Sequence, residues 1–163
     1  MATATVIHFG TDDCLRVPAL RSAGYEVLVS DTLEELKLSL DHGEGVDAVI
    51  VSGSQPCCIE KAAALVRQHS SAPLILFRQP DAKHNESRFD RVYSGQVAEA
   101  QWLFETAVLV MQCKELRAQA EHLRKQSERV LRETSEVQAE SRRKLEQAAE
   151  LKRKLPLSWP LPD

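Results

Sequence analysis

The sequence predicts an α/β protein: a five-stranded parallel sheet with helices on both faces, whose last helix continues into a long coiled-coil rod. Three observations predict this fold class. Short β-type runs alternate with helical patterns along the first part of the chain. One run, 48–51, is apolar without interruption, as in a central strand that is buried on both faces. Residues 96–155 contain neither Gly nor Pro and consist mostly of strong helix formers.

The elements follow one another in a regular order. The first expected helix covers 15–23, with Pro18 in its first turn, where Pro is tolerated, and Gly24 at its end. The second begins after Thr32, which forms a capping box with Glu35. A third helix covers 59–69. The polar stretch after residue 77 leaves room for no more than a turn or two of helix. The expected strands are 5–9, 25–29, 48–51, 74–77 and 91–93.

Five strands that alternate with helices in this way make a flavodoxin-like doubly wound sheet, with a crevice at the carboxyl ends of the strands. We expect a globular domain over 1–112, a coiled-coil helix over 113–155 that continues the last helix of the domain, and a Pro-rich tail over 156–163. Pro156 ends the helix, because Pro disfavours helix in the residue before it. Trp159 in the tail is either a docking peptide for a partner or a side chain that folds back on the helix.

The coiled-coil interpretation depends on heptad spacing. Every second position of the stripe is Leu or Val, while the positions between are small or weakly polar, and Lys144 interrupts the pattern. Dimerisation through this face is the preferred interpretation. Two alternatives stay open: a helix that binds a different partner helix, and a helix that is only solvated. The small residues fit a parallel or an antiparallel pair. The expected contact residues are Leu109, Cys113, Leu116, Ala120, Leu123, Val130, Val137 and Leu151.

Charge and composition exclude several classes of protein. Residues 1–113 carry 9 basic and 15 acidic side chains, whereas 114–155 carry 12 and 8. Alternating signs on the helix indicate a solvated face, and without interleaved aromatic residues they do not predict nucleic-acid binding. No apolar run is long enough to cross a membrane, so we expect a cytoplasmic protein. The four cysteines form no C-x-x-C pair, so we expect small buried hydrophobes and neither a metal site nor a disulfide framework, although the adjacent Cys57 and Cys58 are unusual.

Several segments in succession carry a family resemblance: AGYEV (23–27), DTLEEL (31–36), VDAVIVS (46–52) and APLILF (72–77). The layout resembles the receiver domain of two-component response regulators over about residues 4–112. The resemblance implies a phosphorylated aspartate after the third strand and a magnesium-binding acidic pair after the first. It also implies a hydroxyl residue after the fourth strand and a lysine after the fifth.

The residues at these positions differ from the family pattern. Ser52 stands where the phosphorylated aspartate is expected, and Gly10 and Thr11 stand where the acidic pair is expected. Arg78 replaces the hydroxyl residue and either pairs with an aspartate or points into solvent, while Ser94 replaces the lysine. Two carboxylates, Asp12 and Asp13, follow the acidic-pair position directly. We therefore expect a degenerate phosphorylation pocket.

A serine hydroxyl is a weak nucleophile unless a base activates it, and the pattern suggests no histidine near Ser52. We expect a non-phosphorylatable signalling or scaffolding module, not an enzyme and without a cofactor, whose partner is a second copy or another signalling protein. One alternative is a sensor that holds a small ligand, haem, or a metal or redox centre in the crevice with Cys57, Cys58, His8 or His84, although His8 inside a strand reads as a satisfied core histidine. The other is an atypical phosphotransfer receiver that uses Asp12 or Asp13.

Overall fold

The computed structural model describes residues 4–12, 14–42, 45–53, 55–78, 86–94 and 97–154. The chain divides into two compact units, residues 1–117 and 118–163. Along the chain the elements are β1 (Thr5–Gly10), α1 (Arg16–Ser22), β2 (Glu26–Ser30), α2 (Leu33–His42), β3 (Val46–Gly53), α3 (Pro56–His69), β4 (Leu74–Arg78), the 3₁₀ turn η1 (Glu86–Arg88), β5 (Arg91–Ser94) and α4 (Glu99–Lys154).

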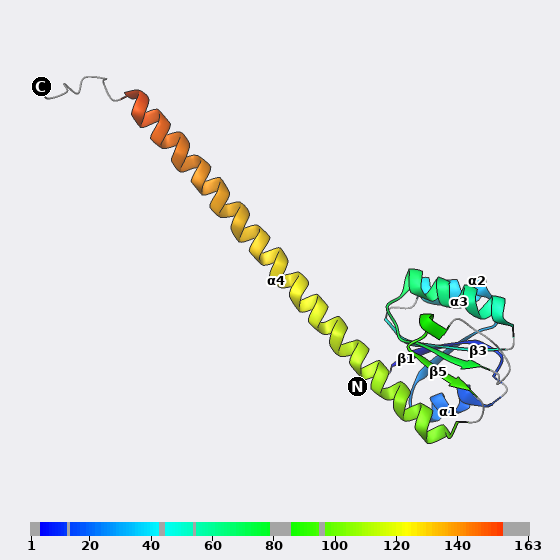
Figure 1. The fold of residues 1–163 in the computed structure, drawn as a ribbon. Coiled ribbons are helices and arrows are strands. Elements are labelled where there is room, and N and C mark those ends of the chain that lie inside the picture. The colour runs from blue at the N-terminus through cyan, green and yellow to red at the C-terminus, as the bar shows by residue number, and fades with distance from the viewer. Residues whose placement is uncertain are drawn as a thin grey trace, which may run out of the picture. The chain divides into compact units, whose positions relative to one another are not determined.

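The first unit is built on a parallel five-stranded sheet with the strand order β2-β1-β3-β4-β5. This is the predicted doubly wound fold, in which the strand order reverses between β1 and β3. Helices α2 and α3 cover one face of the sheet, and α1 and the first part of α4 cover the other (Figure 1). The predicted long terminal helix is also confirmed, and in the structure it runs without interruption from Glu99 to Lys154.

Strand parity sorts the core into two layers. Ile7 and Phe9 of β1 pack with Leu36 and Ile59 under α2 and α3. Val6 shares its side of β1 with His8 and packs in the other core layer, under α1 and α4. In that second layer the aromatic rings of β4, β5 and α4 meet. The ring centroid of Phe77 lies 4.9 Å from that of Tyr93 and 5.5 Å from that of Trp102.

Most elements lie within one residue of their expected bounds, and two of them begin two or three residues earlier than expected. Strand β3 covers Val46–Gly53 and is longer than the expected 48–51, because Asp47 joins the sheet with its carboxylate turned to the backbone of β1. Helix α3 begins at Pro56 instead of residue 59, since Pro is suited to the first position of a helix. The predicted capping box of α2 is present: the Glu35 N–H donates to the Thr32 hydroxyl, and the Thr32 N–H donates to the Glu35 carboxylate, each over 3.2 Å.

A buried carboxylate holds the first part of α4 to the amino-terminal edge of the sheet. The side chain of Asp47 is 8% exposed and lies 3.3 Å from Lys114 Nζ and 3.7 Å from Arg117 Nη1. It also accepts the Thr5 N–H over 3.0 Å. Arg117 Nη2 donates to the Val46 carbonyl over 2.8 Å. These contacts fix α4 to the first unit as far as Arg117.

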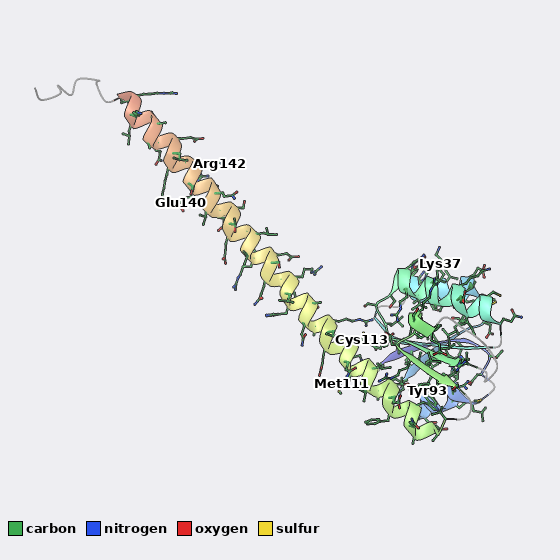
Figure 2. The ribbon with its side chains drawn as sticks, viewed as in Figure 1. Lys37, Tyr93, Met111, Cys113, Glu140 and Arg142 are labelled. Carbon is green, nitrogen blue, oxygen red and sulfur yellow. The ribbon has the colours of Figure 1, made fainter. Side chains whose placement is uncertain are left out.

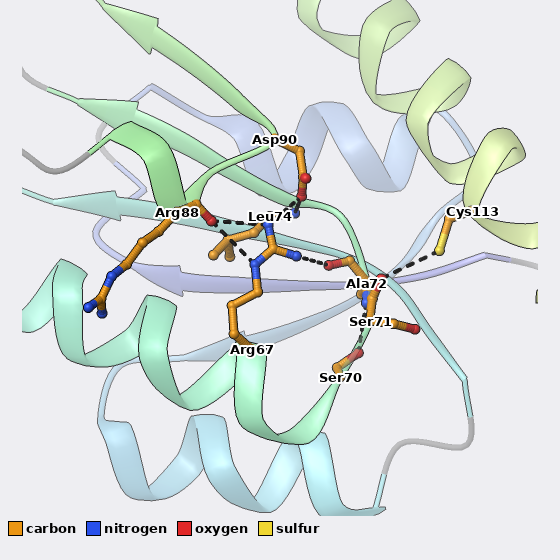
Figure 3. A network of polar contacts seen from close by, with 8 residues as sticks. All are labelled: Arg67, Ser70, Ser71, Ala72, Leu74, Arg88, Asp90 and Cys113. Atoms are coloured by element: carbon orange, nitrogen blue, oxygen red, sulfur yellow. Dashed lines mark hydrogen bonds and ion pairs between the residues drawn. The ribbon is translucent and has the colours of Figure 1, made fainter. Parts of the chain in front are cut away.

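A second polar network supports the link between η1 and β5 (Figure 3). Arg67, near the end of α3, donates to the Arg88 carbonyl over 3.0 Å and to the Asp90 carboxylate over 2.8 Å. The same carboxylate accepts the Leu74 N–H over 2.6 Å, and the Asp90 N–H donates to the Leu74 carbonyl over 2.8 Å. The link is thus bound to α3 and to the beginning of β4.

Candidate functional site

The candidate site lies at the carboxyl ends of β1 and β3. The sheet register pairs Gly10 with Ser52, so the two positions that the sequence assigned to this edge are neighbours. Gly10 has a φ of +95°, and a Cβ at this position would overlap the Ser52 carbonyl oxygen. Glycine is therefore required here both by its backbone conformation and by the close approach of the two strands, and an aspartate does not fit without a backbone shift.

The hydroxyl of Ser52 is engaged on both sides. It donates to the Thr11 carbonyl over 2.5 Å, and its oxygen lies 3.1 Å from His8 Nε2. Because a serine has a single proton, the bond to Thr11 requires His8 to carry its proton on Nε2 and to act as the donor. In this arrangement the imidazole cannot accept the proton of Ser52, so it does not activate the hydroxyl as a nucleophile.

The expectation that no histidine lies near Ser52 is therefore wrong. His8 lies two residues before Gly10 on the same strand, and this spacing turns its side chain to the face that Ser52 occupies. His8 is fully buried, and its Nδ1 has no hydrogen-bond partner among the described residues, so the core histidine is only half satisfied. Burial lowers the pKa of His8 below its ordinary value of 6.5, while nearby Asp12 opposes this shift.

Asp12 caps helix α1. Its two carboxylate oxygens accept the Arg16 N–H over 2.7 Å and the Val17 N–H over 3.0 Å. A carboxylate in this role meets the partial positive charge of the helix N-terminus. Asp13 lies outside the described residues.

The described residues of the pocket do not fit a magnesium ion. Mg²⁺ prefers a near-octahedral set of oxygen ligands that includes one or two carboxylates. Gly10 contributes no side chain, the Ser52 hydroxyl is engaged, and the carboxylate of Asp12 caps α1.

Two arginines lie on the neighbouring elements, Arg78 at the end of β4 and Arg16 at the beginning of α1. Arg78, at the end of β4, has its Nε 3.4 Å from Glu86 Oε1 of η1, a partner that the sequence pattern did not suggest. Ser94 is exposed and pairs with Arg78 in the register of β4 and β5. Arg16 was not among the predicted site residues; its guanidinium lies 4.1 Å from the centroid of the Phe77 ring. The sequence could have indicated this residue, because Arg16 follows Asp12 by four positions.

A cleft of about 410 Å³ opens beside this edge, between the beginnings of α2 and α3. Phe9, Leu33 and Ile59 give it an apolar floor, and Thr32, Gln55 and Cys58 contribute to its wall. It lies where the strand order reverses, which is the usual ligand position in doubly wound sheets. Its volume is within the range of small-molecule sites.

The cysteines differ from the expectation that they are core hydrophobes. Cys14 and Cys57 are exposed, and Cys58 and Cys113 are partly exposed. Their positions at a loop, at the first turn of α3 and on α4 explain this, since none faces the sheet interior. The two adjacent sulfur atoms of Cys57 and Cys58 lie 4.0 Å apart. Among the described residues no three His, Cys, Asp or Glu side chains lie close enough to hold a metal ion. His84 is outside those residues.

The predicted contact residues of α4 fall into two groups. Leu109 packs against the core layer under α1 and α4, and the Cys113 thiol approaches the Ser71 carbonyl over 3.8 Å, so both face the first unit itself. The others stand on an exposed helix surface. Figure 2 shows the side chains around the later part of α4, including Glu140 and Arg142. The large exposed members are Leu116, Leu123, Val130, Val137 and Leu151, and the small exposed one is Ala120.

Solved receiver structures resemble this chain. The response regulator receiver protein from Sinorhizobium medicae WSM419 is 16% identical, matches 69% of this chain and 98% of its own, and has a TM-score of 0.57. The signal receiver domain of a putative LuxO repressor protein from Vibrio parahaemolyticus is 9% identical over 71% and 96%, with a TM-score of 0.60. The chain has the receiver fold. At these identities the likeness shows the fold alone.

A further match includes a long helix. It is a fusion protein that carries the trimeric coiled coil of yeast Spc42, amino acids 181–211; it is 15% identical over 84% of this chain and 99% of that one, with a TM-score of 0.58. No protein-family model matches the sequence, and no curated protein matches it significantly. Within the described part of the chain, no helix is both long and apolar enough to cross a membrane.

Proposed function

We propose that this protein is a non-phosphorylatable receiver-like module of cytoplasmic signalling, which dimerises through the exposed apolar stripe of α4 and acts by binding or scaffolding and not as an enzyme. The observation that carries the proposal is the pairing of Gly10 with Ser52 at the position of the phosphorylation pocket. With Gly10 and Ser52 at these positions, neither strand end carries the carboxylate on which receiver chemistry depends.

The contacts of the pocket support the loss of phosphorylation. The Ser52 hydroxyl donates to Thr11 and receives a hydrogen bond from His8. It is therefore a hydrogen-bonded part of the core and not an activated nucleophile. Restoring an acid at Gly10 is blocked by the Ser52 backbone. The side-chain oxygens of Asp12 already bind the first N–H groups of α1, which also argues against the atypical phosphotransfer alternative.

The exposed stripe of α4 supports dimerisation. Leu123, Val130, Val137 and Leu151 are 61%, 55%, 62% and 64% exposed. Complete burial of such a side chain contributes about 1.5–3 kcal/mol. Because only 55–64% of each side chain remains to be buried, two copies that cover each other's four side chains gain on the order of 7–14 kcal/mol. This gain is similar to the cost of association in lost freedom, about 4–15 kcal/mol, so burial of the stripe offsets the cost of pairing.

The decisive experiment for dimerisation is the solution mass by light scattering of the full chain beside a version that ends after Arg117. This end preserves the contacts of Lys114 and Arg117 with Asp47. We expect the full chain to be a dimer and the version that ends after Arg117 to be a monomer. Val137→Lys should yield a monomer, whereas Ala139→Lys, two residues along on the outer surface, should stay dimeric. A dimeric truncated protein would move the interface into the first unit and refute the proposal.

Phosphorylation is tested separately. The full chain is incubated with acetyl phosphate and Mg²⁺ beside a phosphorylatable receiver domain as positive control, and intact mass is measured. We expect no phosphoryl adduct on this protein under conditions that label the control. Stoichiometric labelling of Ser52, Asp12 or Asp13 would overturn this part of the proposal and support the phosphotransfer alternative.

The cleft beside Phe9, Leu33 and Ile59 favours a second candidate function, a small-ligand sensor. Visible absorbance and metal analysis of the purified protein test haem and metal ions, and mass spectrometry of denatured protein tests a co-purified organic molecule. A stoichiometric ligand whose loss follows Ile59→Trp, which fills the cleft floor, would favour this function. Purified protein that contains no bound ligand would favour the dimeric module instead.

A further inference from the structure

The exposed stripe of α4, which we call the seam, alternates two sizes of side chain. The large positions hold Leu123, Val130, Val137, Lys144 and Leu151, and the small positions hold Ala120, Ser127, Thr134, Ser141 and Ala148. All of these residues are exposed on a continuous helix. The small residues taken alone fit either direction of the two helices, but their regular alternation with large residues distinguishes the two directions.

In a parallel pair, equivalent seam positions face each other across the dimer. Each small residue then meets the same small residue, and each large residue meets the same large residue. Thin layers at Ser127 and Ser141 would alternate with thick ones at Val130 and Val137. Layers of unequal thickness leave voids between two straight helices, and voids are unfavourable because interiors pack to a uniform high density.

In an antiparallel pair, a small position of one helix faces a large position of the other. In the register that pairs Ser141 with Val137 of the second copy, every layer from Ser127 to Leu151 then contains one small and one large side chain. The layers become nearly equal in thickness. In this direction, each small residue is complemented by a large residue of the second copy.

The charged residue of the seam gives an independent argument. In a parallel pair, Lys144 would face Lys144 of the second copy within one layer, and two like charges side by side are destabilising. In an antiparallel pair it faces a small position, and its ammonium can stay on Glu140, whose carboxylate lies 2.7 Å away. An aliphatic stem that covers the small residue while the charge remains at the surface is a common use of lysine.

Two leucines beside the seam agree with this direction. Leu131 and Leu145 are 70% and 71% exposed, and each follows a large position by one residue. In a parallel pair they would face Gln126 and Glu140 of the second copy. In an antiparallel pair this flanking position faces its own kind, so Leu131 meets Leu145 of the second copy, and the reverse, in the register that pairs Ser141 with Val137.

The hydroxyl of Thr134 does not oppose burial in such a layer. It already donates to the Val130 carbonyl of its own helix over 2.8 Å. An apolar partner surface therefore leaves no donor of this side chain without an acceptor, and the usual cost of burying a hydroxyl is avoided.

We propose that α4 pairs with a second copy of itself in antiparallel orientation, centred near residue 139. This inference rests on the proposed dimerisation and adds its direction. The consequence is that the two receiver-like units are attached at opposite ends of the paired segment instead of beside each other. A scaffold of this kind presents two binding units that do not contact one another.

Pulsed dipolar spectroscopy on spin-labelled full chain tests the direction. The four native cysteines are first replaced by serine, and light scattering must show that this parent keeps the mass of the native protein. A single cysteine for the label is then placed at Ala118 or at Ala139, both on the outer helix surface away from the seam. At a rise of 1.5 Å per residue, we expect about 60 Å between labels at residue 118, and about 20 Å, two helix diameters, at residue 139.

The possible outcomes separate the two proposals. Short distances at both sites in a dimer would refute the antiparallel direction and leave dimerisation intact. A trimeric mass with short distances at both sites would also refute it. A monomeric parent with no dipolar signal, while the native chain is a monomer too, would refute dimerisation itself and point to a foreign helix on the seam. A long distance at residue 118 together with a short one at residue 139 supports the inference.

Discussion

His8 is a side chain whose protonation depends on the fold. It is buried beside Ser52, and burial lowers its pKa below 6.5, an effect to which Arg16 adds and which Asp12 and Asp31 oppose. The unfolded chain therefore binds a proton at a higher pH than the folded protein does. Stability from this group is complete above pH 6.5 and falls as the pH decreases, by at most about 1.4 kcal/mol per pH unit.

We predict that His8→Gln, whose amide can still donate to Ser52, reduces this loss of stability between pH 6.5 and pH 5. Urea unfolding at a series of pH values measures it. His42→Gln is the matched control, since it removes an exposed imidazole and keeps the contact of His8 with Ser52. An unchanged pH slope in His8→Gln would show that another group causes the acid sensitivity.

Thr106 presents the opposite case, a polar group that the fold does not use. It is fully buried on α4, and its hydroxyl has no hydrogen-bond partner among the described residues. A buried unsatisfied hydroxyl costs about 1–3 kcal/mol. Thr106→Val should therefore raise the free energy of unfolding by about 1 kcal/mol in urea titrations, and Thr106→Ser, which keeps the hydroxyl and loses a methyl group, should lower it. A destabilised valine variant would mean that the hydroxyl has an acceptor.

The sequence predicted which residues occupy the strand ends, but it did not predict what they do there. Residue type and strand order were enough to place Ser52 and Gly10 at one edge. The position of His8 was also available from parity, because residues two apart on a strand share a face. Two features could not be predicted in this way: the overlap that a Cβ at Gly10 would make, and the capping of α1 by Asp12. Both depend on distances between backbone segments, which the sequence pattern does not contain.

At the scale of elements, the attachment of α4 to the sheet depends on one buried carboxylate. Asp47→Asn keeps the shape but removes the charge that Lys114 and Arg117 contact. Loss of one partner of a buried pair is expensive, and the partly exposed partners reduce the cost here, so we expect a loss of about 2 kcal/mol. Chemical unfolding of the version that ends after Arg117 measures it without a contribution from the seam.

Lys114→Ala is the matched control for this substitution. Lys114 is 43% exposed, and exposed ion pairs contribute about 0–1 kcal/mol. Its effect should be less than half that of Asp47→Asn. Equal losses in the two variants would assign the attachment to the lysine instead of the buried carboxylate.

Element order and type were predictable because each helix and strand has its own local signal, such as the capping box at Thr32 or the apolar run of β3. The link after β4 was not predictable in this way. Its support comes from Arg67 on α3, which reaches Arg88 and Asp90 more than twenty positions along the chain. Likewise, the heptad count alone could not show that Leu109 and Cys113 already face the first unit.

At the scale of the whole molecule, the two units should differ in what holds them folded. The first has two buried core layers. In residues 118–154 the side chains are exposed throughout, and pairs such as Glu121 with Lys125, 2.8 Å apart, contribute only about 0.2–0.5 kcal/mol each. In proteins, most helical stability comes from the packing of an apolar face, and the apolar face of this segment is the seam. We therefore expect the helix beyond Arg117 to depend on the proposed second copy for its stability.

We predict that thermal unfolding followed by circular dichroism at 222 nm shows two stages. The stage that belongs to residues 118–154 should shift to higher temperature as protein concentration increases, because association stabilises the folded helix by mass action. The stage of the first unit should not shift. The version that ends after Arg117 should show a single transition independent of concentration, and Val137→Lys should lower the first stage of the full chain and remove its dependence on concentration. A helical stage that melts at the same temperature at every concentration would mean that the helix is stable alone, and the seam would then lack the energetic role that the dimer requires.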